Sequence, residues 1–317
     1  MLWEAHAGIF PAPGPGWEAV RAYHDAGFAH VSLNVGFDLL DRDHALATAR
    51  DWARRIEASN WAQMSEDLAG IRAARAAGRL SIAFDIEGAV ALGGDAGMVE
   101  VFHGLGVRQM LLAYNRNTLA AGGCHDEDRG LTAFGRKVVA EMNRVGMIVD
   151  GSHAGERTVM DLLSASEAPV IVSHAGAKTL QPHGRNVSDA VIRAVAAQGG
   201  LIGVCGIGLF LGGAGAERMA DHADHIAQVA GGAAHVALGI DWFPEGPLPG
   251  QDDVAATLAA HPEFWPLDQG YGAPIQVCGP AVVADLEREL LHRGWTAADV
   301  ALVFGGNMVA LAERIWR

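Results

Sequence analysis

The sequence predicts an α/β protein built as one (β/α)8 barrel. Short apolar runs of strand length recur eight times along the chain, and segments with helical spacing fill most of the intervals between them. Several of these segments end at a glycine, as helices do. A chain of 317 residues, half of them apolar, is long enough for such a barrel. We therefore expect a single barrel domain over residues 1–317 with additional helices at its C-terminal end.

The apolar runs and the helical segments place the elements in order. The predicted strands are 2–8, 30–36, 80–87, 107–115, 147–153, 170–174, 200–207 and 235–241. The predicted helices are 17–26, 68–77, 99–105, 134–144, 156–166, 190–198 and 219–229. Residues 244–280 are rich in Pro and Gly, which predicts a long loop over the barrel mouth, and helices follow from residue 281.

Composition limits the partners that the chain could have. The net charge is −14 and no basic run occurs, so we expect neither a nucleic-acid partner nor an anionic membrane. No stretch of about 18 apolar residues predicts a membrane span, and the first residues do not resemble a signal peptide. The three cysteines are widely spaced, which argues against a disulfide framework or a cysteine zinc cluster. These features predict a cytoplasmic protein with reduced thiols.

Two predicted strands, 147–153 and 170–174, each end in Ser-His. One predicted helix separates them, so His153 and His174 would lie at the same end of neighbouring parallel strands. Ligands bind at that end in parallel α/β folds. Two neutral imidazoles held on rigid strands make half of a metal site, because each offers one ring nitrogen.

Further polar residues end other predicted strands: His6, Glu87, Tyr114 with Asn115, and Asp241. A buried polar residue at one strand end is more often structural than functional, but barrel interiors are normally apolar, so the recurrence points to a site. Three His, one Glu and one Asp suit Zn, and Mn or Fe fit the set as well. A carboxylate such as Glu87 could bridge two ions.

Nucleophile chemistry is less well supported by the same region. Ser152 and Ser173 lack a Gly-x-Ser-x-Gly elbow, and Cys205 lies in a predicted core strand. The glycines of residues 203–208 lack the spacing of a dinucleotide or phosphate loop.

The ordered motifs of the chain are specific enough to identify a resemblance. They are Ile86-Glu87-Gly88; Gly106-Val107-Arg108; Tyr114-Asn115 with Asn117; Gly130-Leu131-Thr132-Ala133-Phe134-Gly135; Glu141-Met142-Asn143-Arg144; Ser152-His153; Ser173-His174; Arg185-Asn186; and Gly239-Ile240-Asp241. They lie within residues 83–241, and Gly305-Gly306-Asn307 matches a C-terminal Gly-x-Asn. In these motifs the chain resembles the membrane dipeptidase (renal dipeptidase) family of zinc peptidases, amidohydrolase-like barrels, as a divergent bacterial-type member.

The resemblance implies a role for each matching residue. Glu87 would bridge two metals, and His153 and His174 would complete one of the two sites. Asp241 would serve as a ligand and general base, and Arg185 would hold the substrate carboxylate. The alternative for Arg185 is a loop ion pair with Asp189. A homodimer is suggested by the resemblance alone.

The chain departs from the family pattern at two positions: one that would bind a metal, and one that would stabilise the oxyanion formed when the amide carbonyl is attacked. The family opens with Asp-x-His-x-Asp, whereas this chain has Glu4-Ala5-His6-Ala7-Gly8, so the site containing His6 loses a charged ligand. We therefore expect one firmly bound Zn ion and a weakened second site. Tyr114 stands where the peptidases carry a His, and a phenol can also donate one hydrogen bond.

These observations predict a zinc-dependent dipeptidase-like hydrolase. A metal-activated water would cleave dipeptides or small N-acyl amino acids, including those with a C-terminal D-residue. Tyr114 and Asn115 would contact the substrate together with Arg185. Two alternatives remain open: a family member that performs tautomerase- or lyase-like proton transfer in a biosynthetic pathway, and a barrel that binds a small carboxylate without turnover.

Overall fold

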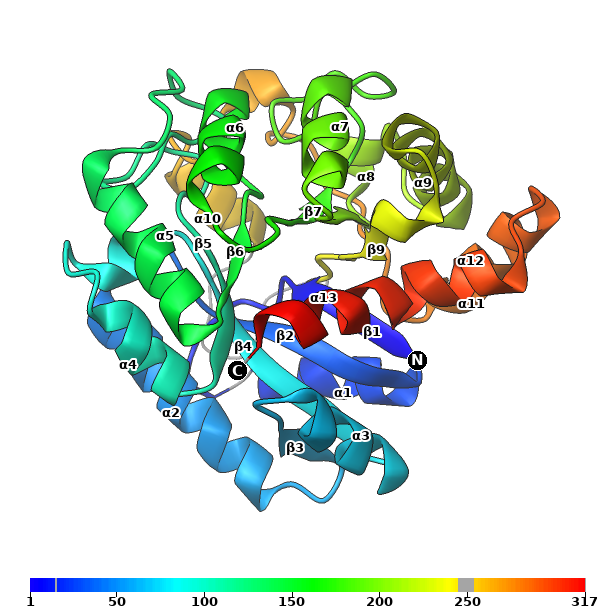
Figure 1. Cartoon of the computed structure of the whole chain (residues 1–317), viewed down its shortest axis with the longest axis horizontal. Helices are drawn as coiled ribbons and strands as arrows, with labels where there is room; N and C mark the ends of the chain where they lie inside the picture. Colours follow the sequence, from blue (N-terminus) through cyan, green and yellow to red (C-terminus); the bar gives the residue numbers. More distant parts are fainter. Residues whose placement is uncertain (15, 245–253, 317) are drawn as a thin grey trace.

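The predicted barrel is present in the computed structural model, which describes residues 1–14, 16–244 and 254–316 (Figure 1). Its parallel strands are β1 (Leu2–Ala7), β2 (Phe28–Phe37), β4 (Leu80–Glu87), β5 (Val107–Leu111), β6 (Ile148–Asp150), β7 (Val172–Ala175), β8 (Ile202–Val204) and β9 (Val236–Leu238). One ladder runs β1-β2-β4-β5-β6 and a second runs β7-β8-β9. Backbone hydrogen bonds join the two ladders, from Gly151 N to Ile171 O at 2.8 Å and from Asp241 N to His6 O at 3.2 Å.

A side chain reinforces the joint between β9 and β1. The buried carboxylate of Glu4 accepts hydrogen bonds from the backbone N–H of Ile240 at 2.6 Å and of His6 at 3.3 Å. Burial raises the pKa of Glu4 to about 8. This carboxyl group therefore replaces part of the missing ladder between the two strands.

Helices surround the strands, as Figure 1 shows. They are α1 (Trp17–Asp25), α2 (Arg42–Ala58), α3 (Leu68–Ala76), α4 (Met98–Gly104), α5 (Ala133–Val145), α6 (Glu156–Ala165), α7 (Asp189–Ala197), α8 (Gly208–Leu211), α9 (Ala216–Ala230), α11 (Val282–His292), α12 (Ala297–Ala301) and α13 (Asn307–Ile315). Each of the seven predicted helices is present to within three residues at either end. None of the described helices combines the length and apolarity that a bilayer span requires.

Two elements between β2 and β4 were not predicted. Helix α2 lies in a segment with many charged residues, and its buried face has helical spacing: Ala45, Ala49, Trp52 and Ile56. Asp41 caps the helix by accepting a hydrogen bond from His44 N. Strand β3 (Ala62–Met64) pairs with residues 80–82 of β4, whereas β5 pairs with residues 84–87. A three-residue strand gives too short a pattern for prediction from sequence.

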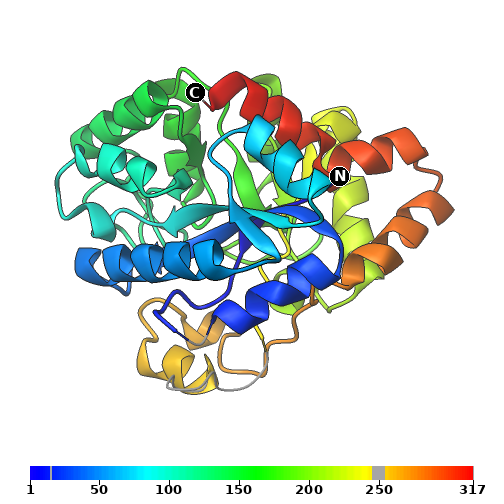
Figure 2. The same cartoon turned by 90° about the horizontal axis from the view of Figure 1, so that it is seen from below.

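The two ends of the barrel are closed differently. Figure 2 shows α13 at one end, and α10 (Val254–Ala260) with the residues after it at the opposite end. Residues 254–276, here called the cover, include α10 and the short helix η3 (Leu267–Gln269). The cover is attached to the loop after β5 by Asn115 Nδ2, which donates to Phe264 O, and by Arg116 Nη1, which donates to Glu263 O. The predicted loop over the mouth thus contains helices, and its residues 245–253 lie outside the described part of the chain.

Candidate metal centre

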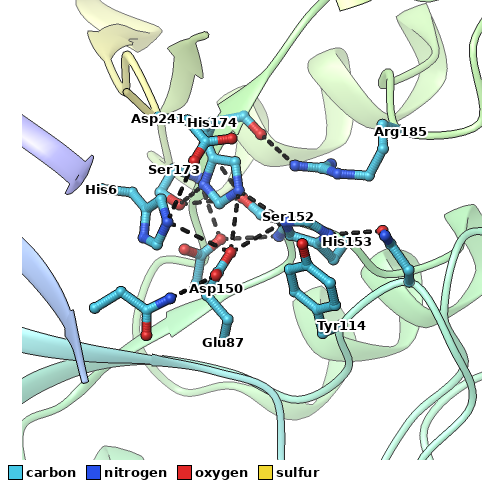
Figure 3. A network of polar contacts seen from close by, with 12 residues as sticks. His6, Glu87, Tyr114, Asp150, Ser152, His153, Ser173, His174, Arg185 and Asp241 are labelled. Atoms are coloured by element: carbon cyan, nitrogen blue, oxygen red, sulfur yellow. Dashed lines mark hydrogen bonds and ion pairs between the residues drawn. The ribbon is translucent and has the colours of Figure 1, made fainter. Parts of the chain in front are cut away.

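Three imidazoles converge on one carboxylate at the mouth of the barrel (Figure 3). His6 belongs to β1, Glu87 ends β4, His153 follows β6 and His174 belongs to β7. The Nε2 atoms of the three histidines lie 3.4, 3.1 and 3.5 Å from Glu87 Oε1, in chain order. His153 Nε2 is also only 2.9 Å from His174 Nε2. The carboxyl ends of four strands, as predicted, bring these side chains together.

The other ring nitrogen of each histidine has a partner of its own. His6 Nδ1 lies 3.1 Å from Asp85 Oδ2, and His174 Nδ1 lies 2.8 Å from Ser173 Oγ. His153 Nδ1 lies 2.7 Å from Asn115 Oδ1. A hydrogen bond at Nδ1 fixes the ring and turns the Nε2 lone pair toward the centre.

The donor set fits a divalent cation. His6 Nε2 is buried and makes no hydrogen bond within the described chain, although it faces Glu87. Ligand atoms of His6, Glu87 and His174 all lie within 4.8 Å of one another. Two imidazole lone pairs that face each other repel unless a proton or a cation lies between them. Three nitrogens and one carboxylate oxygen are ligands that Zn²⁺ and related ions accept.

Burial and charge perturb the pKa values of the cluster in different directions. Burial lowers the pKa of His153 and His174 well below the usual value, so both rings stay neutral and keep a lone pair for a metal. Burial also acts on His6, but the carboxylates of Asp85 and Glu87 outweigh it and raise its pKa. Burial raises the pKa of Glu87 to about 8. Concentrated buried carboxyl groups favour a bound cation.

Asp241 occupies the space beside Gly8. Its Oδ1 lies 3.6 Å from His6 Nε2, and a Cβ added to Gly8 would be 2.2 Å from that same oxygen. Burial raises the pKa of Asp241 to about 6. Glycine at position 8 therefore leaves room for the Asp241 carboxylate next to His6.

Three residues of the site have a left-handed backbone. Asn115, His153 and Asp241 have φ of 59°, 61° and 56°, and they are the non-glycine residues with positive φ in the described chain. Asn, Asp and His tolerate this conformation better than most residues. Each follows the end of a barrel strand, so the turn directs its side chain over the centre.

Tyr114 lies against the centre from the loop after β5. Its ring stacks on His153 with centroids 4.2 Å apart and an interplanar angle of 25°. Its hydroxyl accepts from Trp265 Nε1 of the cover at 3.3 Å. Burial, followed by the charge of Glu87, raises the pKa of Tyr114 well above its usual value, so the phenol keeps its proton. Because an indole N–H only donates, the Tyr114 proton remains available for another acceptor.

Arg185 is buried beside His174. Its Nη2 donates to His174 O at 3.2 Å, its Nε has no hydrogen-bond partner in the described chain, and its guanidinium lies over the Phe210 ring at 5.4 Å. Asp189, the partner in the alternative interpretation, instead accepts from Thr179 and lies 2.8 Å from His225 Nε2. A buried guanidinium with an unused donor suits an anionic ligand.

A cavity of about 500 Å³ opens above the centre. Its lining includes Gly8, Phe10, Asn34, Phe37, Leu40, Glu87, Tyr114, Asn115, His153, Phe210, Asp241, Phe243, Leu258, Trp265 and Tyr271. The described part of the chain thus brings His6, Glu87, Tyr114, Asn115, His153, His174 and Asp241 to one place.

Sequence reasoning missed several residues that support the site. Asn34 Nδ2 donates to Glu87 Oε2 at 2.6 Å, and Asp85 accepts from His6. A polar residue inside an apolar strand run was the available signal for both. No signal marked Trp265 or Tyr271 within the Pro- and Gly-rich stretch. Both polar atoms of the Asn115 amide, predicted to contact substrate, are engaged by His153 and the cover.

The fold and the site define a (β/α)8 barrel with a cluster of histidines and a carboxylate that could hold a metal ion, and comparison with known proteins gives its family. The family model of the membrane dipeptidases, peptidase family M19, matches residues 24–256. The chain belongs to this family.

Two curated relatives are fungal. The chain is 38% identical to an uncharacterized dipeptidase of Schizosaccharomyces pombe over 197 residues, which cover 58% of this chain and 47% of that one. It is 34% identical to the dipeptidase aclJ of Aspergillus oryzae over 241 residues, covering 73% of this chain and 51% of that one. The chain therefore spans about half the length of the curated relatives it matches.

Solved structures resemble the whole barrel. An amidohydrolase from Pseudomonas aeruginosa superposes with a TM-score of 0.88 at 25% identity, covering 100% of this chain and 96% of that one. A metallopeptidase from Rhodobacter sphaeroides, liganded with a phosphinate mimic of L-Ala-D-Ala, has a TM-score of 0.78 at 22% identity and covers 99% of each chain. The second likeness shows the fold alone.

Proposed function

We propose that this chain is a metal-dependent hydrolase that cleaves the amide bond of dipeptides or small N-acyl amino acids. The observation that carries the proposal is the convergence of His6, His153 and His174 on Glu87 within a cavity of about 500 Å³. Family membership supports the same reaction class. The ligand of the Rhodobacter sphaeroides structure supports the inclusion of substrates with a C-terminal D-residue.

We further propose that one zinc ion binds firmly, with Glu87, His153 and His174 as its ligands. A second ion at His6, Glu87 and Asp241 would bind more weakly, because Gly8 supplies no carboxylate. When bound, such an ion supplies Lewis acidity, which makes water a better nucleophile and polarises a carbonyl group. Mn or Fe would serve with the same ligands.

The surrounding residues would divide the remaining tasks. Asp241 accepts the proton of the attacking water and returns it to the leaving nitrogen. Tyr114 donates its hydroxyl proton to the oxygen that gains charge as the carbonyl is attacked. Arg185 binds the substrate carboxylate, and its buried, partly unpaired guanidinium supports this role.

The test is the metal content of the purified, undialysed protein measured together with hydrolysis of a panel of L,L and L,D dipeptides and N-acyl amino acids. We expect about one ion per chain and turnover that a chelator abolishes and added zinc restores. Bound metal without turnover of any amide would contradict the hydrolase and favour proton-transfer chemistry. Absence of metal would contradict the assigned roles of His153 and His174.

A further inference from the structure

Apolar side chains make up much of the lining of the cavity above the metal centre. Around the barrel the strands follow the order β1, β2, β4, β5, β6, β7, β8, β9, so β2 and β7 are diametrically opposed. Arg185 lies on the β7 side, bonded to His174 O; it does not itself line the cavity, but its guanidinium lies over the ring of Phe210, which does. Phe37 ends β2 on the other side. If the substrate carboxylate binds Arg185, as proposed above, the part of the cavity around the end of β2 lies across the centre from it.

The β2 side of the cavity is an apolar wall. It is formed by Phe37 and Leu40, at and after the end of β2, and by Phe10 and Trp265, whose rings pack near Phe37. The Phe10 and Phe37 rings pack edge to face with centroids 5.6 Å apart, and Phe37 lies 6.4 Å from Trp265. Phe37 and Trp265 are both buried. This wall offers contact area to a large apolar group.

Nothing in the described lining of this wall offers a free partner to a cation. The carboxylates that line the described cavity are Glu87 and Asp241. Glu87 accepts from Asn34 and faces the imidazoles, and Asp241 faces His6. His44 is engaged with the backbone, its Nε2 lying 2.7 Å from Pro11 O. Gly8, on the β1 side, contributes no side chain. A substrate ammonium at this position would exchange its hydration for aromatic ring faces, without a carboxylate partner in the described wall.

We infer that the preferred substrates are N-acyl amino acids with a bulky apolar acyl group, rather than dipeptides with a free amino terminus. The inference rests on the proposed function, since it takes Arg185 as the carboxylate site and the metal centre as the place of amide cleavage. The acyl group lies against the apolar wall, and the amino-acid carboxylate lies at Arg185. Cleavage adds water across the amide and releases an apolar carboxylic acid and a free amino acid.

The decisive comparison uses L-Phe-L-Ala and 3-phenylpropionyl-L-Ala, which differ only in the α-amino group, with acetyl-L-Ala as the small acyl reference. With the zinc-loaded protein, we expect kcat/KM for 3-phenylpropionyl-L-Ala to exceed that for acetyl-L-Ala by at least about tenfold and that for L-Phe-L-Ala by a similar factor. Equal or faster cleavage of L-Phe-L-Ala would overturn the inference.

A charged residue introduced into the apolar wall gives a second test of where the acyl group binds. Leu40→Glu supplies a carboxylate near the expected acyl group, so it should shift the preference toward L-Phe-L-Ala by at least about tenfold, whereas the uncharged Leu40→Gln should not. An equal shift in both variants, or none in either, would contradict the assigned position of the acyl group.

Binding separates this inference from the proposed function. If no amide is hydrolysed, the hydrolase proposal fails, and titration calorimetry with the same three compounds then tests the wall alone. Tighter binding of 3-phenylpropionyl-L-Ala than of the other two compounds would still support an apolar acyl site. Equal affinities, or no binding of any compound, would overturn it.

Discussion

At the scale of single residues, the site depends on partners that orient each ligand. Asp85, Asn115 and Ser173 engage the Nδ1 atoms of the three histidines. His153 and His174, whose lowered pKa keeps them neutral, can therefore present an Nε2 lone pair without losing side-chain freedom on binding. The Nε2 atoms of all three rings lie within 3.5 Å of Glu87 Oε1, so this carboxylate would be the shared ligand of the centre.

Replacing Glu87 by Gln should weaken metal binding by at least about tenfold, because a neutral amide oxygen replaces the anionic ligand. Competition with a zinc chelator measures the change. Glu18→Gln, an exposed position of α1, is the matched control and should bind metal as the unaltered chain does. Unchanged affinity in Glu87→Gln would contradict the assigned ligand set.

Tyr114→Phe tests the proposed oxyanion donor. The ring and its stacking on His153 are kept, so KM and the melting temperature should change little, while kcat should fall by about 100-fold. Steady-state kinetics with the best substrate of the panel gives both constants. A rise in KM at constant kcat would instead indicate that Tyr114 only binds the substrate.

At the scale of elements, the cover connects the barrel mouth to the centre. Trp265 donates to the Tyr114 hydroxyl, and the Asn115 side chain bonds both His153 and Phe264 O. The position of the cover is thus coupled to the orientation of two residues at the centre.

Trp265→Phe removes the indole donor and keeps an aromatic ring. We expect kcat to fall several-fold, to about one fifth of its value, because the Tyr114 hydroxyl can then rotate toward other partners. In the double variant with Tyr114→Phe, kcat should equal that of Tyr114→Phe alone. Additive losses would show that Trp265 acts through a route other than the phenol.

The elements were largely predictable, because buried strands form continuous apolar runs and the helices between them have regular apolar spacing. Helix α2 was missed because its many Arg and Asp residues concealed the spacing of Ala45, Ala49, Trp52 and Ile56. The site was predictable where a polar residue ends a strand, as His153 and His174 do. It was not predictable where contact depends on the folded arrangement, as with Trp265 and the space that Gly8 leaves for the Asp241 carboxylate.

At the scale of the whole molecule, one end of the barrel holds an apolar packing cluster and the opposite end holds the candidate metal centre. The end away from the cover is filled by a cluster that includes Trp3, Ile71, Ile148, Met308, Leu311 and Ile315. His30, near the start of β2, lies 4.2 Å from the Trp3 ring, and its Nδ1 is 2.8 Å from Ser81 Oγ. This end therefore contributes to stability without contact with the centre.

His30 makes the stability depend on pH. Burial lowers its pKa from 6.5 to about 3, so the unfolded chain binds the proton first and the folded state is destabilised as the pH falls below 6.5. His30→Asn, which can retain the bond to Ser81, should reduce the slope of the unfolding free energy between about pH 6 and pH 4 by about 1.4 kcal/mol per pH unit. Denaturant unfolding at several pH values measures the unfolding free energy. If it changed with pH equally in the unaltered chain and in His30→Asn, the lowered pKa of His30 would be contradicted.

The contact between Gly8 and Asp241 makes the two positions interdependent. Because a side chain at position 8 would meet Asp241 Oδ1, the effect of a mutation at either position depends on the residue at the other. Gly8→Asp is accommodated only if the Asp241 carboxylate moves, so a carboxylate introduced at position 8 would displace the one that Asp241 places beside His6.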